Sequence, residues 1–230
     1  MLAYLVRHAE SLTNAQQSAG MNPSLSPLGI RQVQALDRRF AHTQFTALYS
    51  SPFRRCLETA EPMAAGKSCP IRIRPDLHEC YYLPQDRRLD TELPGLSQVL
   101  AAHPGTAVCE DWRGPVNWPS VHETREDLFA RMRGFADYLK QRWGETDVAV
   151  LIISHGSPLA KLVDAWLTEA PGPSYRYAID NATVTALRFE KGVGTLVCLN
   201  ERSHLVGLPA PEVANFETSG AIKPQRPPLR

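Results

Sequence analysis

The hydrophobic positions of the first part of the chain predict a strand followed by a helix. Leu2–Val6 is a short apolar run with a polar break straight after it, which is typical of a central parallel strand buried on both faces. After a polar loop, Ser26 and Pro27 form a helix start, because proline is favoured at the first helical position. The apolar residues that follow recur at helical spacing: Ile30, Val33, Leu36 and Phe40.

The alternation of strand and helix continues along the chain. Ala47–Ser50 reads as a second strand, and a helix is predicted from Pro52 to about Ala64. Ile71–Arg74 is a third, short strand candidate. The rhythm of strand, helix, strand and helix favours an α/β fold.

The second half of the chain contains the clearest helix and the most apolar strand. Glu123 begins a helix whose apolar stripe is Leu128, Met132, Phe135, Leu139 and Trp143. Val148–Ile153 is a dense aliphatic strand, and Leu159–Leu167 follows as a helix. Apolar and polar residues alternate in two further segments, Thr183–Glu190 and Thr195–Asn200. Residues 191–194 join these segments, which predicts a hairpin.

Two segments lack a sustained period. The stretch from Cys80 to about residue 122 reads as an insertion or lid with a short helix around Leu96–Ala102. Beyond Leu205 the chain is rich in proline, and we expect a surface-hugging or partly disordered extension. We therefore predict one catalytic domain over residues 1–205 and a proline-rich tail over residues 206–230.

Charge, apolar runs and cysteine content indicate which partners the chain binds and where in the cell it is expected. The 230 residues carry 25 Lys and Arg against 24 Asp and Glu, so no bulk charge draws the chain to nucleic acid or to a membrane. The apolar amino terminus is too short for a signal-peptide core, and no long apolar run follows. Five cysteines without a C-x-x-C pair argue against a disulfide framework and a thiolate zinc site. A soluble, cytoplasmic protein is the expectation.

Two histidines and two arginines stand where a site is expected. His8 and His155 each follow a predicted buried strand, and ligands of open α/β sheets bind beyond the carboxyl ends of strands. Arg7 precedes the first histidine, and Arg55 follows the second strand. Arginine suits phosphate because its planar fork makes paired, charge-assisted hydrogen bonds. The pattern indicates an anion pocket.

Four ordered motifs resemble those of the histidine phosphatase superfamily, which includes the cofactor-dependent phosphoglycerate mutases. They are LVRHAES at residues 5–11, SSPFRRC at residues 50–56, LHE at residues 77–79 and ISHG at residues 153–156. The resemblance covers roughly residues 1–205 and is weak over the insertion at residues 80–122. It implies a three-layer α/β sandwich, with a mostly parallel central sheet and helices on both faces.

The resemblance also implies a set of roles. His8 would be the nucleophile that receives the phosphoryl group, and Glu79 would protonate the leaving oxygen and later activate water. The groups that would hold the phosphoryl oxygens are Arg7, Asn14, Arg55 and His155. Phosphoryl transfer depends mainly on positioning and charge stabilisation, which such a cage supplies. No metal or organic cofactor is implied.

Several alternatives stay open at this point. The residues after Glu79 depart from the family's usual glycine and tryptophan, so Glu10 or Glu123 could be the proton donor instead. The reaction could be hydrolysis of a small phosphorylated substrate, which we favour, or transfer within a phosphoglycerate, and a noncatalytic phosphate-binding domain is a third reading. The insertion could select the rest of the substrate. The exposed edge of the hairpin could support a homodimer.

Overall fold

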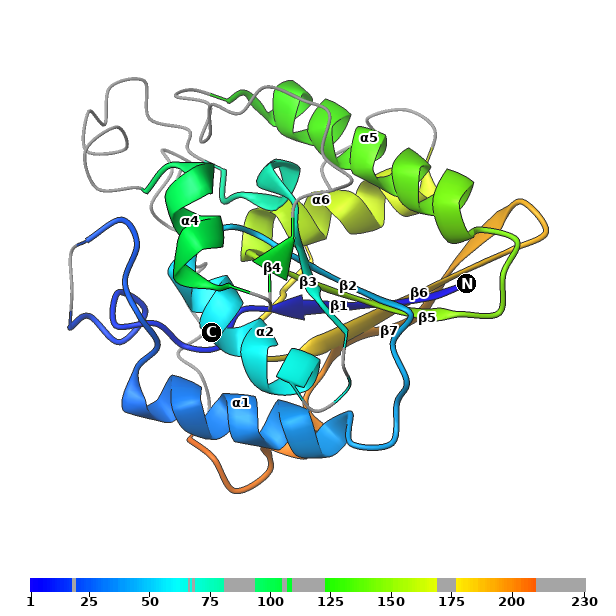
Figure 1. Ribbon diagram of the computed structural model, residues 1–230. Coiled ribbons are helices and arrows are strands. Elements are labelled where there is room, and N and C mark those ends of the chain that lie inside the picture. The colour runs from blue at the N-terminus through cyan, green and yellow to red at the C-terminus, as the bar shows by residue number, and fades with distance from the viewer. Residues whose placement is uncertain are drawn as a thin grey trace, which may run out of the picture.

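A sheet of seven strands, counted over the described residues, forms the middle layer of the computed structural model (Figure 1). The structure describes residues 1–17, 20–65, 67, 69–80, 94–104, 107–108, 123–168 and 177–209. The strands are β1 (Leu2–Arg7), β2 (Ala47–Ser50), β3 (Ile71–Ile73), β4 (Ala107–Val108), β5 (Ala149–Ser154), β6 (Val184–Glu190) and β7 (Val193–Glu201).

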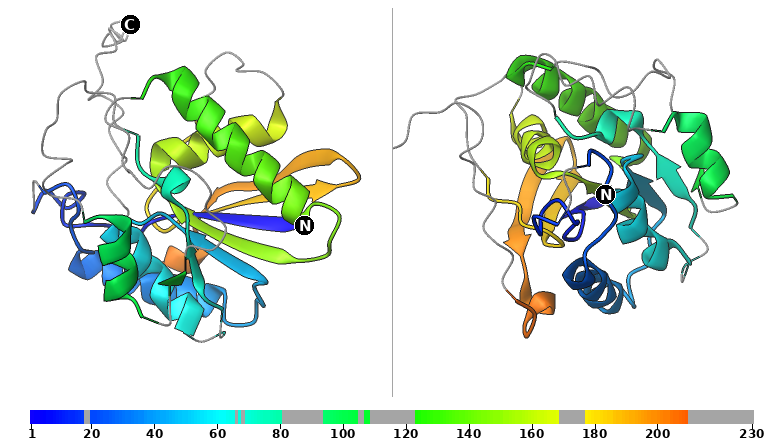
Figure 2. Two further views of the ribbon diagram at one scale, coloured as in Figure 1. Left: turned by 45° about the horizontal axis from the view of Figure 1, so that its top comes forward. Right: turned by 90° about the vertical axis from the view of Figure 1, so that its left-hand side faces the viewer.

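The sheet is parallel over most of its width. Its strand order is β4-β3-β2-β5-β1-β6-β7, and β1 to β5 all pair in parallel. The hairpin of β6 and β7 closes one edge, because β6 runs antiparallel to β1 and β7 antiparallel to β6. The parallel strands therefore end at one edge, onto which the right-hand view of Figure 2 looks.

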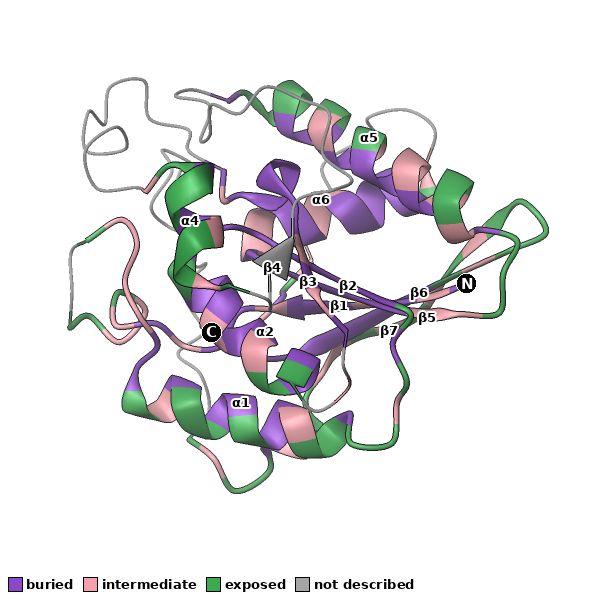
Figure 3. Ribbon diagram, in the orientation of Figure 1, coloured by how far each residue is buried: buried purple, intermediate pink, exposed green. Residues whose placement is uncertain are grey.

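Helices cover both faces of the sheet and complete the three layers. The helices α1 (Pro27–Arg39), α2 (Arg54–Ala65) and α4 (Leu96–Ala102) contribute to one apolar cluster. The helices α5 (Arg125–Trp143) and α6 (Gly156–Leu167) contribute to the other. In Figure 1, α1 and α2 lie below the strands, and α5 and α6 lie above them. Figure 3 shows that the buried sides of the helices face the sheet.

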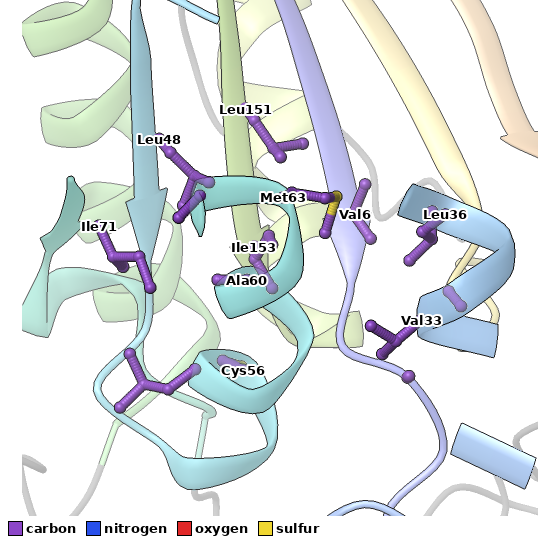
Figure 4. Packing of buried hydrophobic residues seen from close by; sticks show 14 of the residues in the cluster. Val6, Val33, Leu36, Leu48, Cys56, Ala60, Met63, Ile71, Leu151 and Ile153 are labelled. Atoms are coloured by element: carbon purple, nitrogen blue, oxygen red, sulfur yellow. The ribbon is translucent and has the colours of Figure 1, made fainter. Parts of the chain in front are cut away.

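Alternate residues of each central strand enter opposite cores, as the period of two requires. In β1, Val6 packs on the side of α1 and α2, whereas Leu5 packs on the side of α5 and α6. In β5, Ile153 and Ile152 divide in the same way. Figure 4 shows Val6 and Ile153 packed among the side chains of α1 and α2. Burial of one such side chain stabilises the fold by about 1.5–3 kcal/mol.

The start of α1 is held against the loop that follows β1. Ser26 caps the helix, because its side chain accepts a hydrogen bond from the backbone N–H of Gly29 at 3.0 Å. A Cβ atom on Gly29 would lie 2.0 Å from the carbonyl oxygen of Glu10, so glycine permits this close approach. The side chain of Gln32 accepts from the N–H of Glu10 at 2.8 Å. The helix thus fixes the backbone just after His8.

The predicted α/β sandwich is confirmed, and the differences are local. α6 begins at Gly156 and not at Leu159, because Pro158 lies in the first helical turn, where its missing N–H is no loss. Ile30 is 53% exposed, since it lies about 100° round the helix from the face that Gly29 presents to Glu10. The short strand β4 inside the insertion was not foreseen.

Parts of the sequence predictions fall outside the described residues. The helix expected at Leu96–Ala102 is present as α4, but residues 81–93, 105–106 and 109–122 of the predicted lid are not described. The tail from residue 210 onward is not described either. Two short 3-10 helices, η1 (Pro75–Leu77) and η2 (Ser203–Leu205), complete the described elements. No helix in the described ranges is both long and apolar enough to cross a bilayer.

Candidate active site

The two predicted site histidines lie side by side at the carboxyl ends of neighbouring strands. β1 and β5 pair in parallel, with Arg7 opposite Ser154, so the residue after each strand is a histidine. The backbone N–H of His8 donates to the carbonyl of Ser154 at 2.9 Å. The ring centroids of His8 and His155 are 5.1 Å apart. The strand register, set by apolar packing, thus brings together two residues that are far apart in sequence.

The ring of His8 has a defined tautomer. Its Nδ1 lies 2.8 Å from the carbonyl oxygen of Ala9, and a carbonyl can only accept, so Nδ1 carries the proton. Nε2 is then the lone-pair nitrogen, and it accepts a hydrogen bond from Nε of Arg55 at 3.1 Å. Burial, together with the charges of Arg55 and Arg7, holds the pKa of His8 well below the ordinary histidine range. The ring is therefore neutral at neutral pH.

The backbone around His8 is held by side chains from distant elements. Asn181 donates from Nδ2 to the carbonyl oxygen of His8 at 2.9 Å. Thr59 accepts from the N–H of Ala9 at 3.1 Å, and its hydroxyl donates to the carbonyl oxygen of Arg55 at 2.6 Å. Our sequence reasoning assigned no role to Thr59 or Asn181, which lie outside the four motifs. They link the first histidine to α2 and to the start of β6.

Arg55, in the first turn of α2, lies between the two histidines. Besides its bond to His8, it donates from Nη2 to Nδ1 of His155 at 3.0 Å and from Nη1 to the carbonyl oxygen of Met21 at 3.3 Å. Its guanidinium stacks over the ring of Phe53, with the central carbon 4.5 Å from the centroid. The guanidinium plane is thereby fixed beside both rings.

Arg7 extends this positive surface to the start of α6. Its Nη1 donates to the carbonyl oxygen of Ile179 at 2.9 Å, whereas its buried Nε has no partner among the described residues. A Cβ atom on Gly156 would lie 3.7 Å from the guanidinium of Arg7, so this arginine lies against the first residue of α6. A helix amino terminus and a guanidinium both attract anions. The arrangement suits a phosphate group.

His155 is buried and lies among groups that keep it neutral. Its Nε2 lies 2.9 Å from Oγ of Ser51 and 3.5 Å from Sγ of Cys56. Burial is the largest cause that lowers the pKa of His155 well below the ordinary range, and the charge of Arg55 is the next. Ser51 is a contact that our sequence reasoning did not single out.

Glu79 faces the same group of side chains. Its Oε2 is 3.7 Å from Nδ1 of His155, its Oε1 accepts from the N–H of Cys80 at 2.9 Å, and its side chain is 26% exposed. Burial raises the pKa of the Glu79 carboxyl, and the nearby charges of Arg55 and Arg7 oppose this shift without cancelling it. A raised pKa favours a carboxyl that can hold and deliver a proton.

The two alternative proton donors are engaged elsewhere. Glu10 accepts a hydrogen bond from the hydroxyl of Ser26 at 2.6 Å, at the start of α1. Glu123 makes two 2.6 Å contacts with the guanidinium of Arg131. Burial alone would raise the pKa of Glu123, but the hydrogen bonds and charge of Arg131 outweigh burial and lower it. These partners favour Glu79 as the donor.

Asn14 lies within the same hydrogen-bonded group. Its Oδ1 accepts from the N–H and the hydroxyl of Ser11, at 3.2 and 3.0 Å, and from Nδ2 of Asn181 at 3.3 Å. Arg54, the neighbour of Arg55 on α2, is exposed and pairs with Glu58 at 2.6 Å. In the described part of the chain, no three His, Cys, Asp or Glu side chains are arranged to hold a metal ion.

Comparison with known proteins assigns the family. The sequence model of the histidine phosphatase superfamily (branch 1) matches residues 3–202. The chain belongs to this superfamily. It is 29% identical over 213 residues to a protein of Schizosaccharomyces pombe named a probable phosphatase, covering 89% of this chain and 71% of that one. It is 25% identical to phosphoserine phosphatase 1 of Hydrogenobacter thermophilus, over 87% of this chain and 92% of that one.

Solved structures agree on the fold of this superfamily member. A phosphoserine phosphatase from Entamoeba histolytica, crystallised with phosphoserine, superposes with a TM-score of 0.62 at 19% identity, covering 89% of this chain and 99% of that one. At that identity the likeness concerns the fold alone. Because the chain belongs to this superfamily and its relatives are named phosphatases, it is a hydrolase of the phosphatase branch. The prediction of an enzyme is confirmed over the noncatalytic reading.

Proposed function

We propose that this phosphatase hydrolyses small phosphomonoesters through a phosphohistidine formed on Nε2 of His8. One observation carries the proposal: the Nδ1 proton of His8 is tied to the carbonyl of Ala9, which leaves Nε2 as a lone pair directed toward Arg55. An imidazole in this tautomer is a nucleophile without further deprotonation. The adjoining guanidinium marks where a phosphoryl group would be held.

In the first half-reaction, the Nε2 lone pair of His8 attacks phosphorus as the ester P–O bond breaks. The carboxyl proton of Glu79 passes to the ester oxygen, and the alcohol departs neutral. Arg7, Arg55 and His155 hold the phosphoryl oxygens, and Asn14 adds a neutral donor. The raised pKa of Glu79 and the lowered pKa of His8 supply the required protonation states.

In the second half-reaction, water attacks the phosphorus of phosphohistidine. The Glu79 carboxylate takes a proton from the water, the P–N bond breaks and its electron pair returns to Nε2 of His8. Orthophosphate leaves and both side chains regain their starting protonation states. A proton donor and acceptor of this kind contributes about 10²–10⁴-fold in rate.

The substrate we propose is a small phosphorylated metabolite in the cytoplasm. Relatives that span nearly the same length are named phosphoserine phosphatase and adenosylcobalamin/α-ribazole phosphatase. Phosphoserine is a small phosphomonoester, which supports this substrate class. Phosphoglycerate mutase activity is the competing reaction, because it shares the first half-reaction and differs only in the acceptor.

Trapping the intermediate tests the proposal. With a ³²P-labelled phosphomonoester and rapid acid-free quenching, the wild-type protein should carry an acid-labile label. The label should vanish in His8→Ala and persist in His42→Ala, a matched change at an exposed histidine. In the presence of an added alcohol, the phosphoryl group can pass from the protein to the alcohol or to water. Two different esters should give the same ratio of these products, because both form the same phosphoenzyme.

Other results would contradict the proposal. A label that persists in His8→Ala would show that another residue is phosphorylated. Ratios that depend on the leaving group would indicate direct attack by water. If the protein isomerises a phosphoglycerate faster than it releases phosphate, its activity is that of a mutase and not that of a phosphatase.

A further inference from the structure

Ser51, directly after β2, presents its hydroxyl to a ring of the candidate site. It is fully buried, and its N–H donates to the carbonyl oxygen of Ile153 in β5 at 3.0 Å. Its Oγ lies 2.9 Å from Nε2 of His155. The strand pairing that fixes the backbone of Ser51 therefore also fixes its hydroxyl relative to His155.

The direction of that hydrogen bond follows from the other side of the ring. A guanidinium has donors only, so Nδ1 of His155, 3.0 Å from Nη2 of Arg55, is the acceptor in the neutral ring. The single ring proton then lies on Nε2 and points to Oγ of Ser51. Among the described residues, the side chains that face the His155 ring are Arg55, Glu79, Ser51, Cys56, His8 and Phe53.

We propose that Ser51 is a positioning residue for His155, whose ring proton it keeps on Nε2 so that Nδ1 faces the phosphoryl group. Nδ1 is the nitrogen that faces Arg55 and, at 3.7 Å, Oε2 of Glu79. To donate to a phosphoryl oxygen, Nδ1 must gain a second proton while Nε2 keeps the first. That proton is taken up from water when the phosphoryl group binds, because the negative charge of the phosphate favours the imidazolium. Ser51 accepts from Nε2–H in both charge states. The catalytic consequence rests on the proposed function, whereas the tautomer does not.

Cys56 is a weaker candidate for the same task. Its Sγ lies 3.5 Å from Nε2 of His155, and burial raises the pKa of the thiol to about 12, so it stays a neutral thiol. A thiol sulfur is a weak acceptor. Without the Ser51 hydroxyl, Nε2–H would be left with this poor partner, and the two tautomers would lie closer in energy.

The tautomer can be measured directly in the free protein. Long-range ¹H–¹⁵N spectra should show the Nε2–H form of His155 in the wild type, with the signal assigned by its loss in His155→Ala. Ser51→Ala should shift the ring toward a mixture of tautomers. Ser50→Ala is the matched control, because Ser50 is equally buried and its hydroxyl donates to the carbonyl oxygen of Ser51. It should leave the tautomer unchanged.

Kinetics with p-nitrophenyl phosphate should follow the tautomer. Ser51→Ala should lower kcat/KM about 10- to 100-fold, the range expected for a buried donor left unpaired. Ser51→Thr should restore kcat/KM. In a His155→Ala background, Ser51→Ala should have almost no further effect, since the serine acts through that ring.

The outcomes separate the two proposals. If Ser51→Ala keeps the wild-type tautomer, or costs as much in the His155→Ala background as alone, the positioning role is wrong. If Ser51→Ala does not fold, Ser51→Cys tests the same point with a weak acceptor of similar size, and an unchanged tautomer would again refute the role. If the wild type hydrolyses no phosphomonoester, the proposed function fails, and the spectra still decide what Ser51 does to His155.

Discussion

At the scale of single residues, Glu79 combines two properties that a proton donor needs. Its carboxyl is buried enough to raise its pKa, yet a quarter of the side chain remains exposed, so a leaving alcohol and water can reach it. One oxygen is held by the N–H of Cys80, and the other is 3.7 Å from His155. An acid with a raised pKa is fully active below that pKa and loses activity as the pH rises through it.

Glu79→Gln should therefore separate substrates by their leaving groups. For an alkyl phosphate, phosphorylation of His8 should slow about 10²–10⁴-fold, because the alkoxide leaves without a proton. For p-nitrophenyl phosphate the loss should be much smaller in this step, and the phosphoenzyme should accumulate, since the later activation of water is also impaired. Quench-flow with both substrates measures the difference. Glu61→Gln, on α2 and paired with His103, is the control, and equal losses for both substrates would contradict the role of Glu79.

The sequence could place some site residues and not others, for a physical reason. His8 and His155 follow buried strands, and the ends of such strands are visible as apolar runs that stop. Ser51, Thr59 and Asn181 each contact the site through a hydrogen bond that spans 104, 50 and 173 residues of sequence, respectively. No period or spacing reports contacts of that range, because they depend on how the finished elements pack.

At the scale of elements, α5 holds the segment that carries Glu79. Arg131, in the second turn of this helix, donates from Nη1 to the carbonyl oxygens of Asp76 and His78, at 2.6 and 3.1 Å. Its other donors bind both oxygens of Glu123, just before α5. The described ends on either side of the insertion, near residues 80 and 123, are thus joined through one guanidinium.

Arg131→Lys should loosen this segment, because one ammonium group cannot reproduce a two-oxygen ion pair and two carbonyl contacts. We expect kcat for an alkyl phosphate to fall about tenfold, because the Glu79 carboxyl would no longer be held where it can protonate the leaving oxygen. The loss for p-nitrophenyl phosphate should be smaller. Steady-state assays on both substrates measure this. Arg125→Lys, at an exposed position of the same helix, is the control. A uniform loss on both substrates would show that Arg131 supports folding and not the placement of Glu79.

Elements were predictable from the sequence where apolar runs and caps coincide. Leu2–Arg7 and Ala149–Ser154 are strands because their side chains fill two cores at once. The start of α6 was missed by three residues, since a Gly-Ser-Pro stretch that reads as a loop also suits a first helical turn. β4 was missed because two residues are too few for a periodic signal.

The homodimer stays a prediction. The outer strand β7, whose edge was expected to support it, exposes Val193, Val197 and Leu199.

At the scale of the whole molecule, buried histidines link stability to pH. His8, His78 and His155 are all buried, and burial is the largest cause that lowers the pKa of each. For His78 the pKa falls to about 4, with the charge of Arg131 as the next cause. In the unfolded chain these rings regain an ordinary pKa near 6.5. The unfolded state therefore binds more protons in this range, and the free energy of unfolding rises with pH.

The expected consequence is a loss of stability on mild acidification. His78 contributes stability that is present above about pH 6.5 and is lost as the pH falls toward 4, which amounts to about 2 kcal/mol at pH 5. His8 and His155 act in the same direction, whereas the raised pKa of Glu79 opposes them. Urea unfolding at pH 7.5 and pH 5 measures the difference. In His78→Asn, whose amide can still donate to the carbonyl oxygen of Glu79, the pH dependence should shrink, while His42→Asn at an exposed site should leave it unchanged. Equal pH dependence in both variants would show that His78 is protonated alike in the folded and unfolded chain.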